Sequence, residues 1–341
     1  MSAPAGTADG AGNTGPGRVL RIGVLGCADI AWRRMLPAIV AEPRTRLVAV
    51  AGRDAAKARR FTDRFGGEPV EGYERLLGRT DLDAVYVPLP TGLHARWAVE
   101  ALGRGLHVLV EKPLATGRAE AAAMLTAARG AGLCLMENLM FLHHGQHEEV
   151  RRLVAAGEIG EPRSLSASFG IPALPAGDIR HRADLGGGCL LDVGVYPLRT
   201  ARLLLGPELD PVGAVLRVDP ALGVDVAGHV LLTTPAGVTA ELSFGFEHAY
   251  RCSYALWGGA GRIVLDRAFT PPPTLRPVLR LEQQDLVREY TLPADDQYAA
   301  VVRSFAAAVL DGAEPRDGEE DLLGTADLVD RVRACAREIR R

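Results

Sequence analysis

The sequence predicts an α/β protein with two domains, a doubly wound parallel sheet followed by an α+β domain on a mainly antiparallel sheet. Between residues 19 and 138, short apolar strands alternate with helical stretches, which is typical of parallel strands joined by right-handed crossovers. From residue 139 onward, strand-like runs follow one another with little helix between them. The length of 341 residues also exceeds the size at which single cores stop growing.

The elements of the first domain follow in a regular order. Strands are expected over residues 19–26, 47–52, 83–90, 107–112 and 133–137, and helices over 29–41, 54–65, 92–104 and 117–131. The stretch 1–18 contains mainly Gly, Ala, Pro and polar residues without the apolar segment of a signal peptide, which predicts a disordered tail. Ligands of such sheets bind at the carboxyl ends of the strands.

The second domain is expected over residues 139–341, and its terminal helices could pack back on the first. Val238, Ala240, Leu242, Phe244 and Phe246 alternate with polar or small residues, which indicates a sheet with one buried face. Strands are expected over 163–170, 212–219, 227–234, 238–247, 252–258 and 261–266, helices over 145–156, 188–205, 297–310 and 321–339, and a proline-rich loop over 270–277.

Composition excludes several classes of protein. With 39 Lys and Arg against 42 Asp and Glu, the formal net charge is -3, and no basic run interleaved with aromatic residues predicts nucleic-acid binding. No apolar run reaches the roughly 18 residues that a membrane span requires. The five cysteines are scattered without CxxC spacing, which argues against a disulfide framework or a metal site and favours a reducing cytoplasm.

The first strand ends in "GVLGCADIA", where a dinucleotide-binding turn is expected. The fingerprint positions hold Gly26, Ala28 and Ala31, so only the first glycine of GxGxxG is present. We expect this turn, including Asp29 and Ile30, to contact a cofactor. The alternative is a tight strand-to-helix turn without a ligand.

The second strand ends at Gly52, Arg53 and Asp54. A guanidinium at this place favours the 2'-phosphate of NADP(H) over the ribose of NAD. Asp54 could cap the next helix in either case, and Arg53 could instead be a solvated loop charge.

The third strand leads into Leu89, Pro90 and Thr91, which we expect beside the cofactor. Thr91 has the position of a helix N-cap. His94, in the first helical turn, is either a cofactor contact or a packing residue.

The fourth strand ends at Glu111, Lys112 and Pro113, at the same sheet edge as Gly26 and Arg53. A partly desolvated ammonium beside a nicotinamide would have a pKa lowered toward working pH, and it could donate a proton to a carbonyl that accepts a hydride. The alternative is a surface Glu-Lys pair before a turn.

In the second half, Gly186 to Gly188 open an apolar helix, as expected where backbone approaches a ligand closely. Asp192 and Tyr196 are four residues apart, which predicts that they share one helical face. A phenol and a carboxylate in one crevice would form an acid and its orienting partner, although a packed core tyrosine is the alternative.

Together these segments resemble the glucose-fructose oxidoreductase, inositol dehydrogenase and rhizopine-catabolism (Gfo/Idh/MocA) family, most specifically in "EKPLA" at 111–115 and "GGGCLLDVGVYPL" at 186–198. The resemblance implies a Rossmann domain, an open-faced sheet domain and oxidation or reduction of a sugar-like carbinol with NAD(P). It also implies that Lys112 is the active-site lysine, that Tyr196 stands where members have His or Tyr, and that Asp192, Arg180 and Tyr298 match further positions of the site.

Within the family, residues 136–162 resemble the 3-ketoreductases that act on dTDP-linked 3-keto-6-deoxysugars for antibiotic glycosylation. That resemblance implies a substrate side formed by Met140, Phe141, His144, His147 and Tyr196. It implies NADPH-dependent reduction of the sugar C3 carbonyl, with Lys112 favoured as proton donor, in a homodimer or homotetramer. Alternatives are a dehydrogenase of a free sugar or trans-dihydrodiol, and a non-catalytic NADP-sensing protein.

Overall fold

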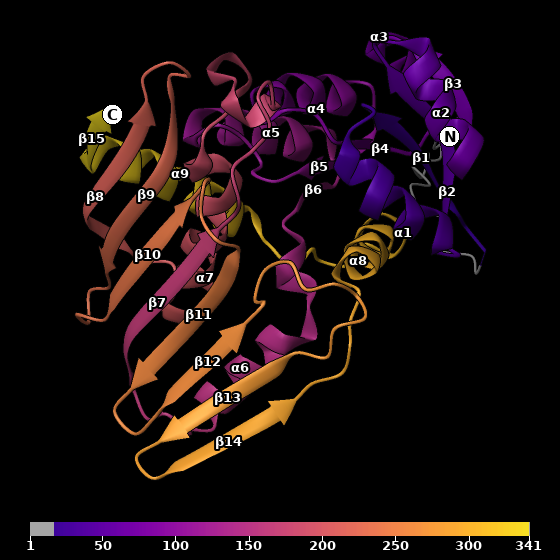
Figure 1. The fold of residues 1–341 in the computed structure, drawn as a ribbon. Helices are drawn as coiled ribbons and strands as arrows, with labels where there is room; N and C mark the ends of the chain where they lie inside the picture. Colours follow the sequence, from indigo (N-terminus) through magenta and orange to yellow (C-terminus); the bar gives the residue numbers. More distant parts are fainter. Residues whose placement is uncertain (1–16, 341) are drawn as a thin grey trace, which may run out of the picture.

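A computed structural model describes residues 17–340, which form two β-sheets with helices packed against them (Figure 1). The first sheet is parallel, and the second is mainly antiparallel. The predicted fold class is therefore confirmed. The predicted disordered tail, apart from residues 17 and 18, lies outside the described residues.

The first sheet has six strands in the order β3-β2-β1-β4-β5-β6, and every pair is parallel. Its central strands contain almost only buried side chains, as expected for a sheet covered on both faces. The strands are β1 (Leu20–Leu25), β2 (Thr45–Gly52), β3 (Glu68–Glu71), β4 (Ala84–Val87), β5 (His107–Glu111) and β6 (Leu135–Asn138).

Helices cover both faces of this sheet. The helices α4 and α5 pack together with α9 on one face, and α1 packs against α8 on the other. The core on the second of these faces continues without a break into the second domain. The bounds are α1 (Leu36–Ala41), α2 (Ala55–Phe65), α3 (Tyr73–Leu77), α4 (His94–Gly103) and α5 (Arg118–Ala131).

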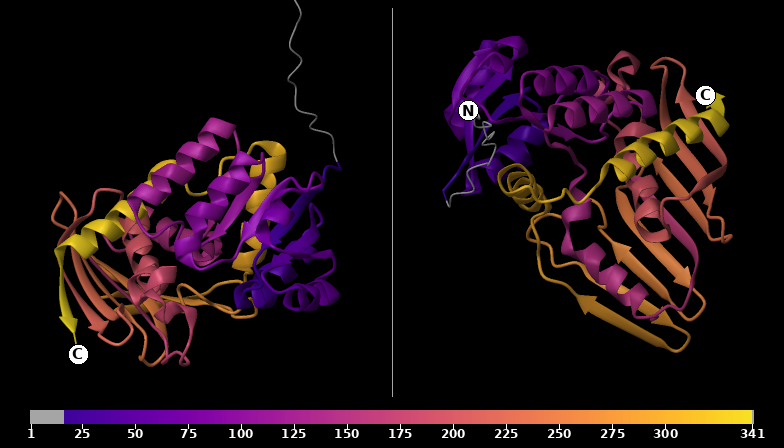
Figure 2. Two further views of the ribbon diagram at one scale, coloured as in Figure 1. Left: turned by 90° about the horizontal axis from the view of Figure 1, so that it is seen from above. Right: turned by 180° about the vertical axis from the view of Figure 1, so that it is seen from behind.

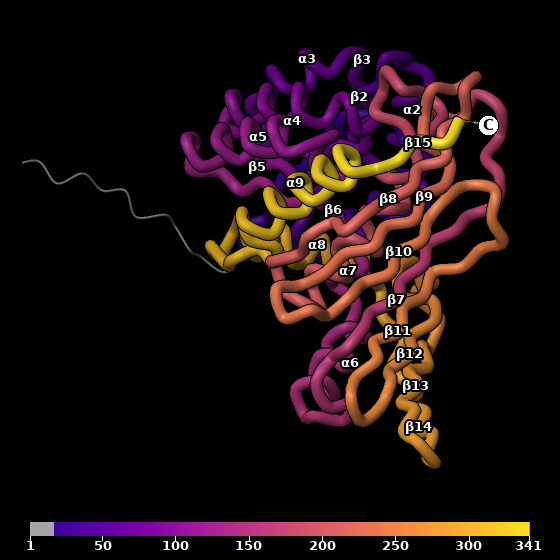
Figure 3. The backbone as a smooth tube through the Cα atoms, turned by 90° about the vertical axis from the view of Figure 1, so that its left-hand side faces the viewer, coloured from indigo at the N-terminus to yellow at the C-terminus, as the bar shows by residue number. Residues whose placement is uncertain are grey.

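The second sheet has nine strands in the order β14-β13-β12-β11-β7-β10-β9-β8-β15, which Figure 3 shows in succession. Only the pairs β7–β10 and β8–β15 are parallel. The strands are β7 (Pro162–Gly170), β8 (Asp210–Asp219), β9 (Val224–Thr233), β10 (Thr239–Gly245), β11 (Arg251–Gly258), β12 (Arg262–Asp266), β13 (Val278–Gln283), β14 (Leu286–Thr291) and β15 (Ala336–Arg340).

One face of the second sheet is packed, and the other is open. Ala240, Leu242, Phe244 and Phe246 are buried as predicted, whereas Trp257 on β11 is 62% exposed. Helices α6 (Gly145–Ala155) and α7 (Val195–Leu205) belong to this domain, and α8 (Gln297–Asp311) and α9 (Glu319–Cys335) follow the sheet. Seen from behind, α9 crosses the back of the sheet toward β8 and passes beside α5 (Figure 2). Among the described helices, none has both the length and the apolar character needed to cross a membrane.

Several elements differ from the sequence-based prediction. Four elements were not predicted: β3, α3, β13 and β14. The strands β3 and β14 escaped prediction because they are largely exposed and lack a clear alternation of buried and exposed residues. The last helix was expected to reach residue 339, but it ends at Cys335, and Ala336–Arg340 pairs with β8. The open edge of β8 overrides the local helical pattern there.

Candidate active site

The candidate site is a cavity of about 750 Å³ between the two domains. The carboxyl ends of β1, β4 and β5 form one wall, and the end of β7, the loop after it and the first turn of α7 contribute to the other. Of the predicted site residues, Ala28, Asp29, Ile30, Leu89, Pro90, Thr91, Glu111, Lys112, Met140, Arg180, Asp192, Tyr196 and Tyr298 line this cavity, whereas Gly26, Gly52, Arg53, Asp54, His94, Pro113, Phe141, His144 and His147 do not.

The turn after β1 packs closely against the loop after β4, and this contact requires a glycine at position 26. Its φ is +129°, and a Cβ at this position would lie 2.9 Å from Cδ2 of Leu89 and 3.2 Å from the carbonyl oxygen of Pro88. Ala28 and Asp29 follow at the cavity wall, and a single π-helical turn (Ala31–Met35) leads into α1. The residues from Ala28 to Ile30 therefore lie at the cavity wall just before a helix, where a dinucleotide would bind.

The end of β2 presents a free guanidinium. Asp54 caps α2 by accepting hydrogen bonds from the amides of Ala56 (2.8 Å) and Lys57 (3.4 Å). Arg53 is exposed and forms no ion pair with any residue in the range 17–340. Its charge is therefore available to a phosphate outside the main cavity.

His94 lies inside the first domain and corresponds to the packing alternative, not to the cofactor contact. It is completely buried, and its ring nitrogens lie 2.8 Å from the carbonyl oxygen of Leu89 and 2.9 Å from that of Pro113. It thereby links the loop after β4 to the loop after β5. Thr91 starts a short 3₁₀ turn (Thr91–Leu93) and makes no side-chain cap, so the predicted N-cap is wrong.

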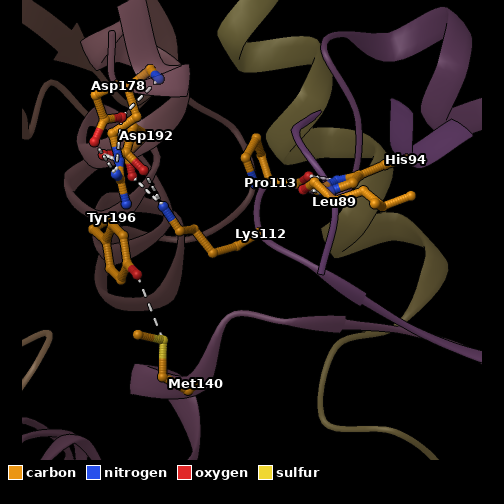
Figure 4. A network of polar contacts seen from close by, with 9 residues as sticks. Leu89, His94, Lys112, Pro113, Met140, Asp178, Asp192 and Tyr196 are labelled. Atoms are coloured by element: carbon orange, nitrogen blue, oxygen red, sulfur yellow. Dashed lines mark hydrogen bonds and ion pairs between the residues drawn. The ribbon is translucent and has the colours of Figure 1, made fainter. Parts of the chain in front are cut away.

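Lys112 is held at the cavity wall by an ion-pair network (Figure 4). Its Nζ donates to Oδ1 of Asp192 at 2.7 Å and to the carbonyl oxygen of the same residue at 2.6 Å. The other carboxylate oxygen accepts from Nε of Arg180 at 2.8 Å, and Arg180 also pairs with Asp178. Burial acts to raise the pKa of Asp192, but the two neighbouring cations more than offset burial and lower it below its ordinary value.

Asp192 therefore orients the lysine and not the tyrosine, in contrast to the predicted Asp192–Tyr196 pair. Residues Leu190–Gly194 form a π-helical turn before α7 begins. Asp192 and Tyr196 still line the same cavity, as their spacing predicted. Sequence spacing alone could not show which partner Asp192 contacts there.

Tyr196 faces the same cavity from α7. Its side chain is nearly buried, its hydroxyl donates to Sδ of Met140 at 3.6 Å, and Nζ of Lys112 lies 5.3 Å from its ring centroid. The rings of Phe169 and Phe269 pack against it at centroid distances of 4.9 and 5.5 Å. Burial raises the pKa of the phenol well above its ordinary value, which keeps the hydroxyl protonated.

Three residues predicted on the substrate side lie in the interior instead. Phe141 is fully buried, and His144 caps α6 by accepting from the amide of Gln146. The ring nitrogens of His147 lie 3.0 Å from the hydroxyl of Tyr254 and 3.0 Å from the carbonyl oxygen of Ala268. These contacts anchor the loop that carries Phe269, and burial lowers the pKa of His147 to about 3. The resemblance implied a substrate contact for these three residues, whereas in the structure their side chains are packed in the interior.

The two domains meet beside the cavity through glycines. A Cβ on Gly186, whose φ is +73°, would lie 2.8 Å from the amide nitrogen of Gly92, and a Cβ on Gly92 would lie 2.9 Å from the carbonyl carbon of Leu185. The glycine run therefore lines the cavity and also permits backbone-to-backbone contact between the domains.

Some cavity residues were not predicted. Arg34 lines the cofactor side and lies over the ring of Tyr298, with its guanidinium carbon 5.9 Å from the centroid. Phe169, Tyr250 and Thr270 line the opposite side. Phe169 lies near the end of β7, and Tyr250 lies just before β11. The sequence placed both residues near strand ends, but it did not give the order of the strands in the sheet, so it could not show that they meet in one cavity.

Comparison with known proteins gives matches over both domains. Residues 20–139 match the model of the "Oxidoreductase family, NAD-binding Rossmann fold", and residues 147–264 match the "GFO/IDH/MocA C-terminal domain".

Individual relatives cover nearly the whole chain. A dTDP-3,4-didehydro-2,6-dideoxy-alpha-D-glucose 3-reductase from Actinomadura kijaniata is 57% identical over 320 residues, which are 94% of this chain and 96% of that protein. A D-xylose 1-dehydrogenase (NADP(+)) from Haloferax volcanii is 36% identical over 92% of this chain and 96% of its own length. The crystal structure of a 3-ketoreductase from Actinomadura kijaniata in complex with NADP and TDP-benzene has a TM-score of 0.93 and 56% identity, covering 95% of this chain and all of the other.

Proposed function

The chain belongs to the Gfo/Idh/MocA oxidoreductase family, and we propose that it reduces the C3 ketone of a dTDP-linked 3-keto (3,4-diketo) 6-deoxysugar with NADPH, in antibiotic deoxysugar biosynthesis. One observation carries this proposal: Lys112 and Tyr196 meet in one cavity at the carboxyl edge of the nucleotide-binding sheet. The similarity to 3-reductases of such sugars over 94% of the chain supports the substrate class.

The cofactor side of the cavity fits NADP(H). The turn after β1 presents Ala28 and Asp29 to the cavity, Arg34 also lines it, and Arg53 is free to bind the 2'-phosphate. The loop at Leu89 to Thr91 and the ring of Tyr298 complete this side. When bound, NADPH supplies the hydride that the ketone carbon accepts.

The protein's own residues then handle the proton and the orientation of the sugar. Lys112 donates a proton to the carbonyl oxygen as that oxygen becomes an alkoxide, and Asp192 holds the ammonium in place through two contacts with Nζ. Tyr196 orients the substrate through its hydroxyl, for which Met140 supplies only a weak sulfur acceptor that a sugar oxygen can replace.

The deciding experiment follows NADPH absorbance with dTDP-3,4-didehydro-2,6-dideoxyglucose generated in situ, and in a second arm follows NADP⁺ reduction with D-xylose or a trans-dihydrodiol. We expect turnover in the first arm. Turnover only in the second arm would identify a dehydrogenase of free substrates, and NADPH binding without turnover in either arm would identify a sensor.

The roles of the two candidate acids are tested with Lys112→Met and Tyr196→Phe. We expect Lys112→Met to lower kcat by about a hundredfold or more, the range of a lost general acid, and Tyr196→Phe mainly to raise KM. The reverse pattern would reverse the two roles.

We also propose a homodimer or homotetramer formed through the open face of the second sheet. The exposed side chains of Trp257 and Leu231 on that sheet support this, and light scattering would measure the mass directly. All five cysteines are free, which agrees with our proposal that the enzyme works in the reducing cytoplasm.

A further inference from the structure

We propose that Arg267, together with the hydroxyls of Tyr250 and Thr270, forms the subsite for the diphosphate of the nucleotide-sugar substrate. This inference depends on the function proposed above and names the residues that would recognise the charged part of the substrate. Arg267 follows β12, and Tyr250 directly precedes β11, its neighbour in the sheet.

The first observation is a cation without a counter-ion. Arg267 is exposed, and among residues 17–340 no carboxylate forms an ion pair with it. Its guanidinium carbon lies 4.6 Å from the ring centroid of Tyr250, and that ring lines the cavity. An arginine stacked on an aromatic ring keeps its N–H donors free for an anion.

The second observation is backbone strain at this place. Within the described part of the chain, only Glu247 and Arg267 combine a side chain with a positive φ, at 63° and 54°. Both residues flank Tyr250, one in sequence and one in space. Strained non-glycine residues persist where the surrounding structure holds them, and they cluster at ligand-binding sites.

Two hydroxyls complete the subsite. The hydroxyl of Tyr250 lies 2.5 Å from Oγ1 of Thr270, and both residues line the cavity. Each hydroxyl can turn its proton toward a phosphate oxygen when one is present. The subsite therefore combines one cation with two neutral donors, a suitable set for a diphosphate.

The distance to the reaction centre fits a nucleotide sugar. The ring of Phe169 lies between the two tyrosines, with centroid distances of 4.9 Å to Tyr196 and 6.4 Å to Tyr250. Phe269, two residues after Arg267, packs on Tyr196 at 5.5 Å. In a nucleotide sugar the carbon that bears the diphosphate is separated from C3 by C2 alone, so the diphosphate must bind this close to Tyr196.

The remaining charges of the cavity leave this role open. The carboxylate of Asp29 is paired with Arg33, and that of Asp192 with Lys112 and Arg180. The cations of that network are thus already paired. Arg34 has no ion pair among residues 17–340, but it lies over Tyr298 on the cofactor side. Arg267 can therefore supply its full charge to the substrate.

The test measures binding of dTDP and of thymidine, by titration calorimetry, to the NADP⁺-saturated enzyme. Loss of a hydrogen bond to a charged group predicts that Arg267→Gln weakens dTDP binding by about tenfold or more, with the Kd of thymidine and of NADPH unchanged. Arg337→Gln, which removes an exposed arginine from the edge strand β15, is the matched control and should bind dTDP like the wild type.

A second variant separates binding from folding. Arg267→Gly removes the guanidinium but also relieves the positive φ, so we expect it to be at least as stable as the wild type and still to lose dTDP affinity. Equal dTDP binding by both Arg267 variants and the wild type would refute the subsite. Equal losses in the Arg267→Gln and Arg337→Gln variants would also refute it. If the wild type itself does not bind dTDP, the proposed function fails, and the subsite fails with it.

Discussion

Replacing Asp192 with asparagine tests the network that holds Lys112, the proposed proton donor. The wild-type carboxylate accepts from Lys112 at 2.7 Å and from Arg180 at 2.8 Å, and its side chain is only 18% exposed. The amide keeps the shape but removes the charge, so two cations would face each other across a neutral group. The carbonyl oxygen of residue 192 still accepts from Nζ, which limits the displacement of the lysine.

The size of the effect follows from one lost charge-assisted hydrogen bond. Such a bond contributes about 1.5 to 3 kcal/mol, which corresponds to a fall in kcat of about 10- to 150-fold. The Kd of NADPH should change little, because Asp192 is not on the cofactor side. Asp184→Asn, which breaks an exposed pair with Arg182, is the control and should leave kcat unchanged.

The same variant has a signature in the pH dependence of stability. The neighbouring cations lower the pKa of Asp192 in the folded protein below its value in the unfolded chain. The ionised carboxylate therefore stabilises the wild type at pH values above the unfolded-state pKa, and this contribution is lost as the pH falls through the folded-state pKa. The difference in unfolding free energy between wild type and Asp192→Asn should therefore shrink in acid, as urea denaturation can measure. Undiminished kcat in Asp192→Asn, or the same loss in Asp184→Asn, would refute the reasoning.

Three further predictions concern the domain contact, a buried carboxyl group and the cofactor. Gly186→Ala should lower kcat/KM by about tenfold or more, because its Cβ would lie 2.8 Å from the amide nitrogen of Gly92. The control Gly157→Ala has a similar φ of +76° but no heavy atom within 4 Å, and it should leave kcat/KM unchanged. Equal kinetics of the two variants would contradict this prediction. Burial raises the pKa of Glu137 from 4.5 to about 7, so its ionisation opposes folding increasingly as pH rises across that interval. Glu137→Gln should therefore add about 3 kcal/mol to the unfolding free energy above pH 7 and little below pH 4. Denaturation curves that show the same gain in unfolding free energy at every pH would contradict this prediction. Arg53→Gln should raise the Kd of NADPH about tenfold and leave that of NADH unchanged, while equal changes in fluorescence titrations with the two cofactors would exclude a phosphate contact.

The fold and the position of the lysine could be predicted because they depend on rules that act along the chain. Strand and helix alternation implied a parallel sheet, and the strand-end rule placed Lys112 at the edge that also carries the turn at Gly26. Both predictions needed only the order of the elements.

The partners of Lys112 could not be predicted, because they depend on local geometry and long-range contact. Asp192 shares the cavity with Tyr196, as their spacing predicted, but its carboxylate pairs with Nζ of Lys112, 80 residues earlier in the chain. His147 has the residue type of a binding group, but its ring is taken up by the hydroxyl of Tyr254 and the carbonyl oxygen of Ala268. No pattern within residues 145–156 indicates either contact, because both come from distant parts of the chain.

The contact between Gly92 and Gly186 has a consequence for how kinetic data on this enzyme are interpreted. At Gly92 and Gly186 the two domains touch through main-chain atoms, which carry no titratable charge and leave added salt little to screen. The ion pair of Lys112 with Asp192, which also joins the domains, is largely buried and is screened much less than an exposed pair. The proposed phosphate contacts of Arg53 and Arg267, in contrast, involve exposed arginines, whose attraction salt weakens. A kinetic salt effect in this enzyme should therefore report mainly on capture of cofactor and substrate, and much less on separation of the two domains.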